Sequence, residues 1–215
     1  MKYSYIYFDI AGTLLFKEHL FETIQSSLSK EGFSVPIDVL REYHTIVSGL
    51  VPSPSTTTKE FYNVFNAAFL HSLGIVPYPK IIDSMYNNCR MLQWKVYDDV
   101  IVLNSLEVRK GVISNWDETL GKKLNDLFPA MFDLVHCSAK EGIKKPSKVF
   151  YEQAFADTKL PASQIVYIGD SIILDMEPAL SLGVNAILID RESRYPWYRG
   201  VRIRSLQELH DVLQT

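Results

Sequence analysis

The stretch YIYFDIAGTLL at residues 5–15 is an apolar run that ends in a single carboxylate, Asp9, and continues through a small residue, a glycine and a threonine. Residues 3–8 are almost entirely β-branched or aromatic, which predicts a strand buried on both faces, as in parallel sheets. Ligands bind at the carboxyl ends of such strands, so Asp9 is a candidate functional residue. Gly12 permits a tight turn, and Thr13 offers a hydroxyl to fix it. Taken alone, the stretch also fits a strand that ends at a solvated aspartate.

The composition is that of an ordinary soluble protein. The chain has 215 residues, of which 47% are hydrophobic and 22% are charged, so it can bury a sizeable core. Its net charge is -3 and its pI is about 6.0, without any run of lysines or arginines. Because basic runs attract nucleic acids and anionic membranes, we expect neither partner and favour a small-molecule substrate. The sequence leaves the oligomeric state open.

The two cysteines, Cys89 and Cys137, lie far apart and have no metal-ligand spacing, so a disulfide scaffold and a structural zinc site are not expected. The chain starts its first strand at once, without the layout of a signal peptide. No apolar run approaches the roughly 20 residues of a membrane helix. These features predict a cytoplasmic protein with free thiols.

Helical periodicity follows the first strand for about 80 residues. Apolar residues recur at helical spacing in four segments, and no strand pattern separates them. The predicted helices cover residues 17–30, 36–48, 59–73 and 79–92, with a polar, proline-containing loop at 51–58. Four consecutive helices predict a small bundle, so we expect residues 16–95 to form a separate helical domain inserted into a core made of residues 1–15 and 96–215.

Strand and helix patterns alternate in the remainder of the chain. Strands are predicted at 108–113, 132–136, 165–168 and 186–189, and helices at 98–106, 117–127, 146–156, 174–182 and 206–213. Such alternation is typical of an α/β fold, and we expect a Rossmann-like, doubly wound and mostly parallel sheet.

Polar residues gather at the predicted strand ends and loops along one edge of this sheet: Asp9, Ser114-Asn115, Lys144-Lys145, and Asp170 with Asp175. Three carboxylates brought close together repel one another and raise one another's pKa unless a cation lies among them. Mg²⁺ prefers such oxygen ligands and keeps positions for water and a phosphate. Without Asp9, the two later aspartates would indicate only helix capping.

Two of these clusters have the chemistry to hold a phosphate. The Ser114 hydroxyl and the neighbouring amides can bind a phosphate oxygen, although serine and asparagine are also common in turns. Lys145 precedes Pro146, which disfavours a helical conformation for this lysine. Its ammonium could neutralise both a nucleophile and a phosphate, whereas Lys144 is expected to be a solvated surface lysine.

In this arrangement the chain resembles the haloacid dehalogenase superfamily. Four motifs occur in the family's order: DIAGT with Asp9, VISN with Ser114, KKP with Lys145, and GDSIILD with Asp170 and Asp175. The resemblance covers the core and leaves out the inserted helices, whose position directly after the first motif matches the family's helical (C1-type) cap. It implies a Rossmann-like core, a mobile helical lid and catalysis through an aspartyl intermediate.

The resemblance also implies roles for individual residues. Asp9 would be the nucleophile, and Lys145 would be the second catalytic residue. The substrate would be bound by Ser114, Asn115 and Thr13. Mg²⁺ would be held by Asp9, the backbone carbonyl of Ala11, Asp170 and Asp175.

Ala11 departs from the pattern of the family's phosphatases, most of which have a second aspartate two residues after the nucleophile as general acid and base. Such assistance contributes about 10² to 10⁴ in rate, or roughly 3 to 5 kcal/mol of barrier. We favour a Mg²⁺-dependent small-molecule phosphatase in which water, Glu18 or His19 replaces this group or turnover is slow. Both side chains also fit exposed positions at the start of a cap helix.

Three other hypotheses explain the absence of the general acid differently. A 2-haloacid dehalogenase expels halide, which needs no proton, and Arg41 could hold its substrate's carboxylate or halide, but family dehalogenases work without metal. Phosphonate hydrolases of the family also carry alanine at the place of Ala11 and use a cap lysine as a Schiff base, for which Lys59 is the first candidate. A catalytically weak member could instead keep a Mg²⁺ and phosphate pocket for binding or regulation.

The substrate itself is not identified, beyond a phosphorylated or halogenated small molecule. The aromatic stripe of Phe61, Phe65 and Phe69 is expected to pack within the lid. Trp116 and the segment YPWY at 195–198 could line a pocket or an interface.

Overall fold

The computed structural model describes residues 2–51 and 58–214, so residues 52–57 of the predicted loop lie outside the described residues. The chain divides into two compact units. Unit 1 comprises Met1–Phe16 and Val96–Thr215, and unit 2 comprises Lys17–Lys95.

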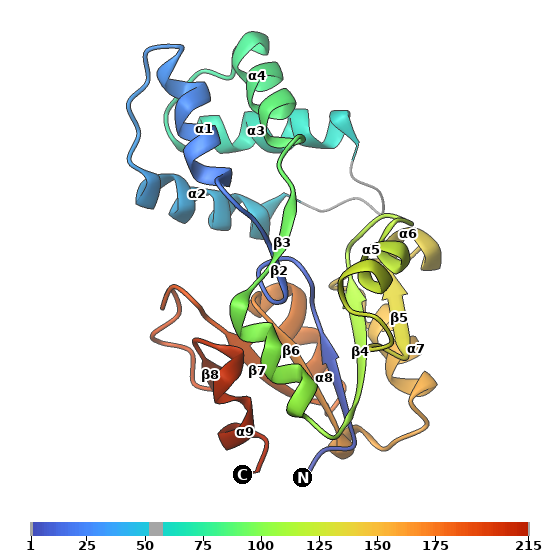
Figure 1. Ribbon diagram of the computed structural model, residues 1–215. Coiled ribbons are helices and arrows are strands. Elements are labelled where there is room, and N and C mark those ends of the chain that lie inside the picture. The colour runs from blue at the N-terminus through green and yellow to red at the C-terminus, as the bar shows by residue number, and fades with distance from the viewer. Residues whose placement is uncertain (1, 52–57, 215) are drawn as a thin grey trace. The chain divides into compact units, whose positions relative to one another are not determined.

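Unit 1 is built on a six-stranded sheet in the order β5-β4-β1-β6-β7-β8 (Figure 1). All five pairings between neighbouring strands are parallel, which confirms the predicted α/β class. The strands are β1 (Tyr5–Phe8), β4 (Arg109–Ser114), β5 (Leu134–Cys137), β6 (Ile165–Gly169), β7 (Asn185–Ile189) and β8 (Val201–Ile203). β1 lies between β4 and β6, and its four residues are fully buried, as their apolar sequence predicts.

Helices connect these strands or follow the last of them. They are α5 (Leu120–Leu127), α6 (Ser138–Glu141), α7 (Lys148–Asp157), α8 (Glu177–Ser181) and α9 (Leu209–Val212), with 3₁₀ helices η1 (Asp98–Ser105), η2 (Ala162–Gln164) and η4 (Leu206–Glu208). The helix predicted at 174–182 begins earlier, as a single π-helical turn, η3 (Ile172–Met176). π turns of this kind are frequently found at functional sites, and this turn carries Asp175.

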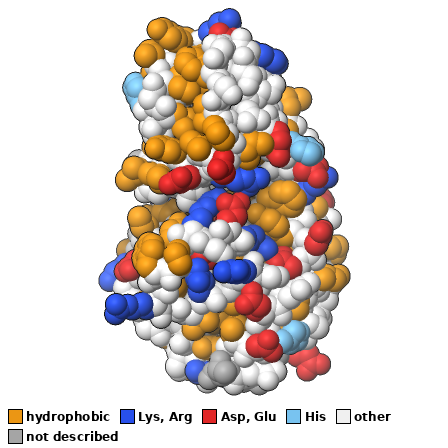
Figure 2. Space-filling view, turned by 90° about the vertical axis from the view of Figure 1, so that its left-hand side faces the viewer, with side chains coloured by type: hydrophobic (Ala, Val, Ile, Leu, Met, Phe, Trp, Pro, Cys, Tyr) orange, Lys and Arg blue, Asp and Glu red, His pale blue; other side chains and the backbone are white. Residues whose placement is uncertain are grey.

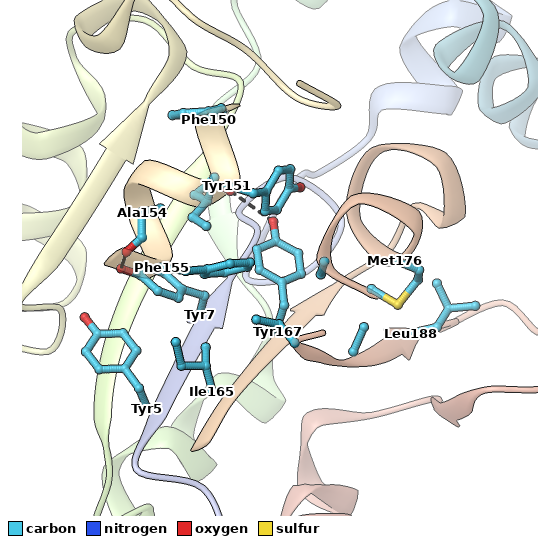
Figure 3. Close-up of a cluster of buried hydrophobic side chains, with 14 residues drawn as sticks. Tyr5, Tyr7, Phe150, Tyr151, Ala154, Phe155, Ile165, Tyr167, Met176 and Leu188 are labelled. Atoms are coloured by element: carbon cyan, nitrogen blue, oxygen red, sulfur yellow. Dashed lines mark hydrogen bonds between the residues drawn. The ribbon is translucent and has the colours of Figure 1, made fainter. Parts of the chain in front are cut away.

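The core of unit 1 contains four tyrosines in one cluster. Tyr5, Tyr7, Tyr151 and Tyr167 are fully buried in one cluster (Figure 3). Each hydroxyl has a partner, as buried polar groups require. For example, the Tyr7 hydroxyl donates to the Ala154 carbonyl at 2.5 Å.

Unit 2 is a bundle of the four predicted helices, α1 (Leu20–Ser29), α2 (Ile37–Leu50), α3 (Lys59–Ser72) and α4 (Pro79–Cys89). Its core includes Leu28, Phe65, Phe69 and Met85, so the aromatic stripe packs within the unit as expected. The Thr58 hydroxyl caps α3 by accepting the Phe61 N–H at 3.3 Å.

Two short strands that the sequence pattern does not predict connect the units. β2 (Leu15–Lys17) and β3 (Trp94–Val96) form a two-stranded sheet. On the unit 1 side, the Tyr97 N–H donates to the Leu14 carbonyl at 3.1 Å, and the Phe16 and Tyr97 rings stack with centroids 4.6 Å apart.

None of the helices in the described ranges has both the length and the apolar character needed to cross a bilayer. On the face drawn in Figure 2, acidic and basic side chains are interspersed with each other and with hydrophobic ones.

Candidate active site

The register of the sheet brings the predicted site residues to one edge. Phe8 at the end of β1 pairs with Val112 on β4 and with Ile168 on β6. The residues that follow these positions, including Asp9 and Asp170, therefore leave the sheet side by side. The carboxylates of Asp9, Asp170 and Asp175 each place an oxygen within 4.8 Å of the others.

Lys145 lies at the centre of this cluster. It is 4% exposed, and its Nζ donates to Asp9 Oδ1 at 2.5 Å, to Asp175 Oδ1 at 2.6 Å and to the Tyr167 hydroxyl at 3.0 Å. Burying a charge is costly unless it is paired and hydrogen-bonded. These three contacts meet that requirement, so the ammonium is fixed beside the predicted nucleophile.

Asn115 lies beside the backbone of Lys145. Its Oδ1 accepts the Lys145 N–H at 2.8 Å, and its Nδ2 donates to the Lys145 carbonyl at 3.2 Å. A carboxamide offers one acceptor and one donor group, which match a peptide backbone. The Asn115 side chain therefore holds the backbone of Lys145, and its predicted contact with the substrate stays a prediction.

Ser114 and Thr13 have different environments. The Ser114 hydroxyl is buried and lies 3.4 Å from Asp9 Oδ1, at the edge where the predicted substrate would bind. Thr13 is fully buried, and its hydroxyl has no hydrogen-bond partner among the described residues. The turn is held instead by the backbone, because the N–H groups of Leu14 and Leu15 donate to the Ile10 carbonyl at 2.9 and 2.8 Å. The predicted contact between Thr13 and the substrate stays a prediction.

Glycines let two of the carboxylates approach the backbone closely. A Cβ added at Gly12 would overlap the Asp170 carboxylate, and one added at Gly169 would overlap that of Asp175. The Ser171 N–H donates to Asp175 Oδ2 at 3.0 Å. No side chain or backbone group among the described residues donates a hydrogen bond to Asp170, which sets this carboxylate apart from the other two.

The charges explain what this cluster can bind. Burial raises the pKa of Asp9 to about 6, with Lys145 opposing and Asp175 reinforcing the effect. Burial and the charges of Asp9 and Asp175 raise the pKa of Asp170 well above its usual range. Burial lowers the pKa of Lys145, but Asp175 and Asp9 outweigh it, so the net shift is upward and the lysine stays charged. One ammonium and three carboxylates give the site a net negative charge. The Asp170 carboxylate, which accepts no hydrogen bond from the described residues, fits a divalent cation with oxygen ligands.

Replacing Gly12 with alanine is expected to weaken the binding of a divalent cation at least tenfold, because the new methyl displaces the Asp170 carboxylate. Gly32 is the matched control, since its φ of +86° resembles the +83° of Gly12 but its added Cβ meets nothing within 4 Å. Both alanine variants should lose about 1 kcal/mol of folding stability from the left-handed backbone. Calorimetric titration with Mg²⁺ checks this result, and equal affinities for the two variants would contradict it.

Arg191, two residues after the end of β7, holds the loop that follows the predicted nucleophile. Its Nη2 donates to the Thr13 carbonyl at 2.8 Å, and its Nε donates to the Gly12 carbonyl at 3.3 Å. It also pairs with Asp99 at 2.6 Å and lies 3.8 Å from the Tyr97 ring centroid. Arg191 lies just beyond an apolar strand that is followed directly by the charged residue Asp190, a signal similar to the one that identified Asp9, yet sequence reasoning missed both. Tyr167 gave no such signal, because it lies inside an apolar strand.

The candidate residues of unit 2 have local partners. Glu18 forms a salt bridge with Lys95, and His19, whose side chain is 67% exposed, lies 3.6 Å from Glu18. Lys59 pairs with Asp83 at 2.8 Å, and this hydrogen bond raises the pKa of the lysine. The Arg41 guanidinium lies 4.5 Å from the Phe21 ring centroid.

The remaining candidates lie in unit 1. Lys144 is half-buried rather than fully solvated. Trp116 donates its backbone N–H to the Ser138 hydroxyl at 3.1 Å. Trp197 is 66% exposed and contacts Tyr195 edge to face, with centroids 5.8 Å apart.

Residues 6–189 match the sequence profile of haloacid dehalogenase-like hydrolases. The chain therefore belongs to this family and is a haloacid dehalogenase-like hydrolase. Solved structures with a similar fold include both a phosphatase and a 2-haloacid dehalogenase.

Two curated relatives and one solved structure illustrate the similarity. Haloacid dehalogenase-like hydrolase domain-containing protein 3 of Danio rerio is 27% identical over 145 residues, which cover 63% of this chain and 60% of that relative's length. Glyceraldehyde 3-phosphate phosphatase of Methanocaldococcus jannaschii is 23% identical over 227 residues, covering 97% of this chain and 96% of the relative. The structure of the HAD-hydrolase YfnB from Bacillus subtilis, bound to magnesium, has a TM-score of 0.70 at 20% identity and covers 100% of both chains.

Proposed function

We propose that this hydrolase is a Mg²⁺-dependent phosphatase that acts on a small phosphorylated molecule through an aspartyl-phosphate intermediate on Asp9. The observation that carries the proposal is the carboxylate cluster, in which the buried Asp9 and Asp175 pair with Lys145 while the more exposed Asp170 has no hydrogen-bond donor among the described residues. A dedicated cation site is what distinguishes a metal-dependent phosphatase from a metal-free dehalogenase.

Asp9, Asp170, Asp175 and the Ala11 carbonyl would hold the cation, which when bound supplies positive charge to the phosphate oxygens. The short bridge between Ala11 and Leu15 uses the Ile10 carbonyl and the Gly12 N–H, so the carbonyl of Ala11 is left out of it. Asp175 already accepts hydrogen bonds on both oxygens, and we assign most of the coordination to Asp9 and Asp170.

In the first step, an Asp9 oxygen forms a bond to phosphorus as the bond from phosphorus to the leaving oxygen breaks. In the second, water attacks the phosphorus, the aspartyl–phosphate bond breaks, and inorganic phosphate and the Asp9 carboxylate are released. The Lys145 ammonium and the Ser114 hydroxyl stabilise negative charge in both steps. Since Ala11 cannot donate a proton, leaving groups of low pKa should react fastest.

The test is the hydrolysis of p-nitrophenyl phosphate, whose leaving group needs little protonation. We expect release of p-nitrophenol in the presence of Mg²⁺ and none after chelation. Activity that is unaffected by chelation would overturn the proposal.

Ala11 also favours a second candidate, a 2-haloacid dehalogenase, because halide departs without a proton. This hypothesis requires chloride release from 2-chloropropionate in the presence of a chelator. A metal-free enzyme would not need the Asp170 carboxylate as a cation ligand. We therefore rank the dehalogenase hypothesis second.

Two further alternatives have weaker support. A phosphonate hydrolase would need a neutral cap lysine, but Asp83 raises the pKa of Lys59 and favours its charged form. Borohydride inactivation that depends on an aldehyde substrate would identify that activity. A regulatory, catalytically weak member is supported by Ala11 alone.

We also propose a cytoplasmic setting for the protein. The free thiols of Cys89 and Cys137 support this setting.

Stabilisation by Mg²⁺ is expected to be larger at about pH 7.5 than at about pH 5. The pKa of Asp9 is raised from its usual value of about 3.9 to about 6, and that of Asp170 is also raised. Between the unfolded-state and the folded-state pKa values of these carboxyl groups, the metal-free folded state binds more protons than the unfolded state. The stability of the metal-free fold therefore falls as the pH rises through this window. Protons therefore compete with Mg²⁺ at the lower pH. Melting temperatures with Mg²⁺ and with a chelator at both pH values check this, and equal Mg²⁺-induced shifts would contradict it.

A further inference from the structure

The ammonium of Lys145 is saturated by its neighbours. It has three N–H donors and no acceptor, and three oxygens lie within hydrogen-bond distance of it. Two belong to the carboxylates of Asp9 and Asp175, at 2.5 and 2.6 Å, and the third is the hydroxyl of Tyr167, at 3.0 Å. Tyr167 matches none of the sequence motifs that identify the site.

The Tyr167 hydroxyl is held in place from other directions. It lies 3.1 Å from the Ile113 carbonyl and 3.0 Å from Asp175 Oδ1, so its single hydrogen has acceptors and its oxygen can accept from the lysine. The ring is fully buried on β6 and packs edge to face against Tyr151, with centroids 5.4 Å apart (Figure 3). The hydroxyl is therefore a fixed point rather than a group that follows the lysine.

Asp170 is the carboxylate that this network leaves out. It lies within the same cluster as Asp9 and Asp175, yet no hydrogen bond or salt bridge from the described residues reaches it. An ammonium with an unused N–H would be attracted to such a carboxylate. The neutral Tyr167 oxygen accepts a hydrogen bond from that N–H without adding a charge to the site.

We propose that Tyr167 is a positioning residue that accepts the third N–H of Lys145, keeps the ammonium on Asp9 and Asp175, and so reserves the Asp170 carboxylate for a divalent cation. The inference rests on the proposed function only in taking that cation to be Mg²⁺. It assigns to one buried hydroxyl the separation of the lysine's site from the metal's site.

The Tyr167→Phe variant tests this proposal because it removes only the hydroxyl. The freed N–H should turn to Asp170 and compete with the cation, and we expect the dissociation constant for Mg²⁺ to rise at least about fivefold. Tyr7→Phe is the matched control, since Tyr7 is fully buried in the same cluster and donates to the Ala154 carbonyl at 2.5 Å without touching Lys145. Its Mg²⁺ affinity should stay within about twofold of wild type, although both variants lose a buried hydrogen bond.

Calorimetric titration of the full chain with Mg²⁺ alone gives a readout that does not depend on turnover. Unchanged affinity in Tyr167→Phe would overturn the proposal, as would an equal loss in Tyr7→Phe or a wild-type chain that does not bind Mg²⁺. If wild type binds Mg²⁺ and only Tyr167→Phe weakens it, the role of Tyr167 is supported even where no phosphatase activity is found. The absence of activity would then count against the proposed function alone.

Discussion

Asp9→Asn is expected to abolish phosphatase activity, with a loss on the order of 10⁴ or more in kcat, the size seen when a nucleophile is removed from other enzymes. A neutral amide does not attack phosphorus, so no aspartyl phosphate can form. The change also removes the charge that Lys145 contacts at 2.5 Å. The measurement is the rate of p-nitrophenol release at saturating Mg²⁺, compared with wild type.

Stability separates this loss from unfolding. Burial raises the pKa of Asp9 to about 6, which means that the ionised side chain is unfavourable in the metal-free fold. The melting temperature of metal-free Asp9→Asn at neutral pH should therefore not fall. Asp126→Asn, at an exposed position on α5, controls for the loss of one negative charge and should retain full activity. Residual Asp9→Asn activity above about 1% of wild type, with deamidation excluded by mass spectrometry, would contradict Asp9 as the nucleophile.

Ala11→Asp is expected to raise kcat for an alkyl phosphate such as glycerol phosphate at least tenfold. An alkoxide is a poor leaving group, and a positioned carboxyl that donates its proton contributes about 10² to 10⁴ in rate. Ala11 is exposed, so the longer side chain can be accommodated without disturbing the core. The gain with p-nitrophenyl phosphate should be much smaller, because that leaving group needs little help.

Ala11→Asn is the matched control, since it has the same shape but no titratable proton. Parallel assays of the two variants on both substrates separate acid catalysis from a general effect of a polar side chain. An equal gain in the two variants would contradict the argument that a proton donor is what this position lacks.

The parts of the fold that depend on local pattern could be predicted. The apolar run of β1 gave a strand buried on both faces, and helical periodicity gave all four helices of unit 2. β2, β3 and β8 were missed, since strands of three residues carry too little alternation to distinguish them from loops. The π-helical turn was missed as well, because the same residues satisfy an ordinary α-helical pattern.

The candidate site was predicted to the extent that its residues follow apolar strands. Asp9, Ser114 and Asp170 all come after such runs, and the parallel sheet then brings them together. The side-chain pairing of Asn115 with the Lys145 backbone joins positions 30 residues apart, and no local pattern encodes it. The same is true of Tyr167, whose sequence environment indicates only a buried strand.

The contacts of Arg191 bear on how this protein could be re-engineered. The Gly12 and Thr13 carbonyls, the Tyr97 ring and Asp99 all belong to unit 1 and meet at one guanidinium. The residues shortly before β2 and directly after β3 are thus anchored within unit 1 by a residue of the same unit. A chimera in which residues 17–95 are exchanged for the corresponding segment of another hydrolase should therefore keep the loop after Asp9 in place, because the contacts of Arg191 with this loop lie in unit 1.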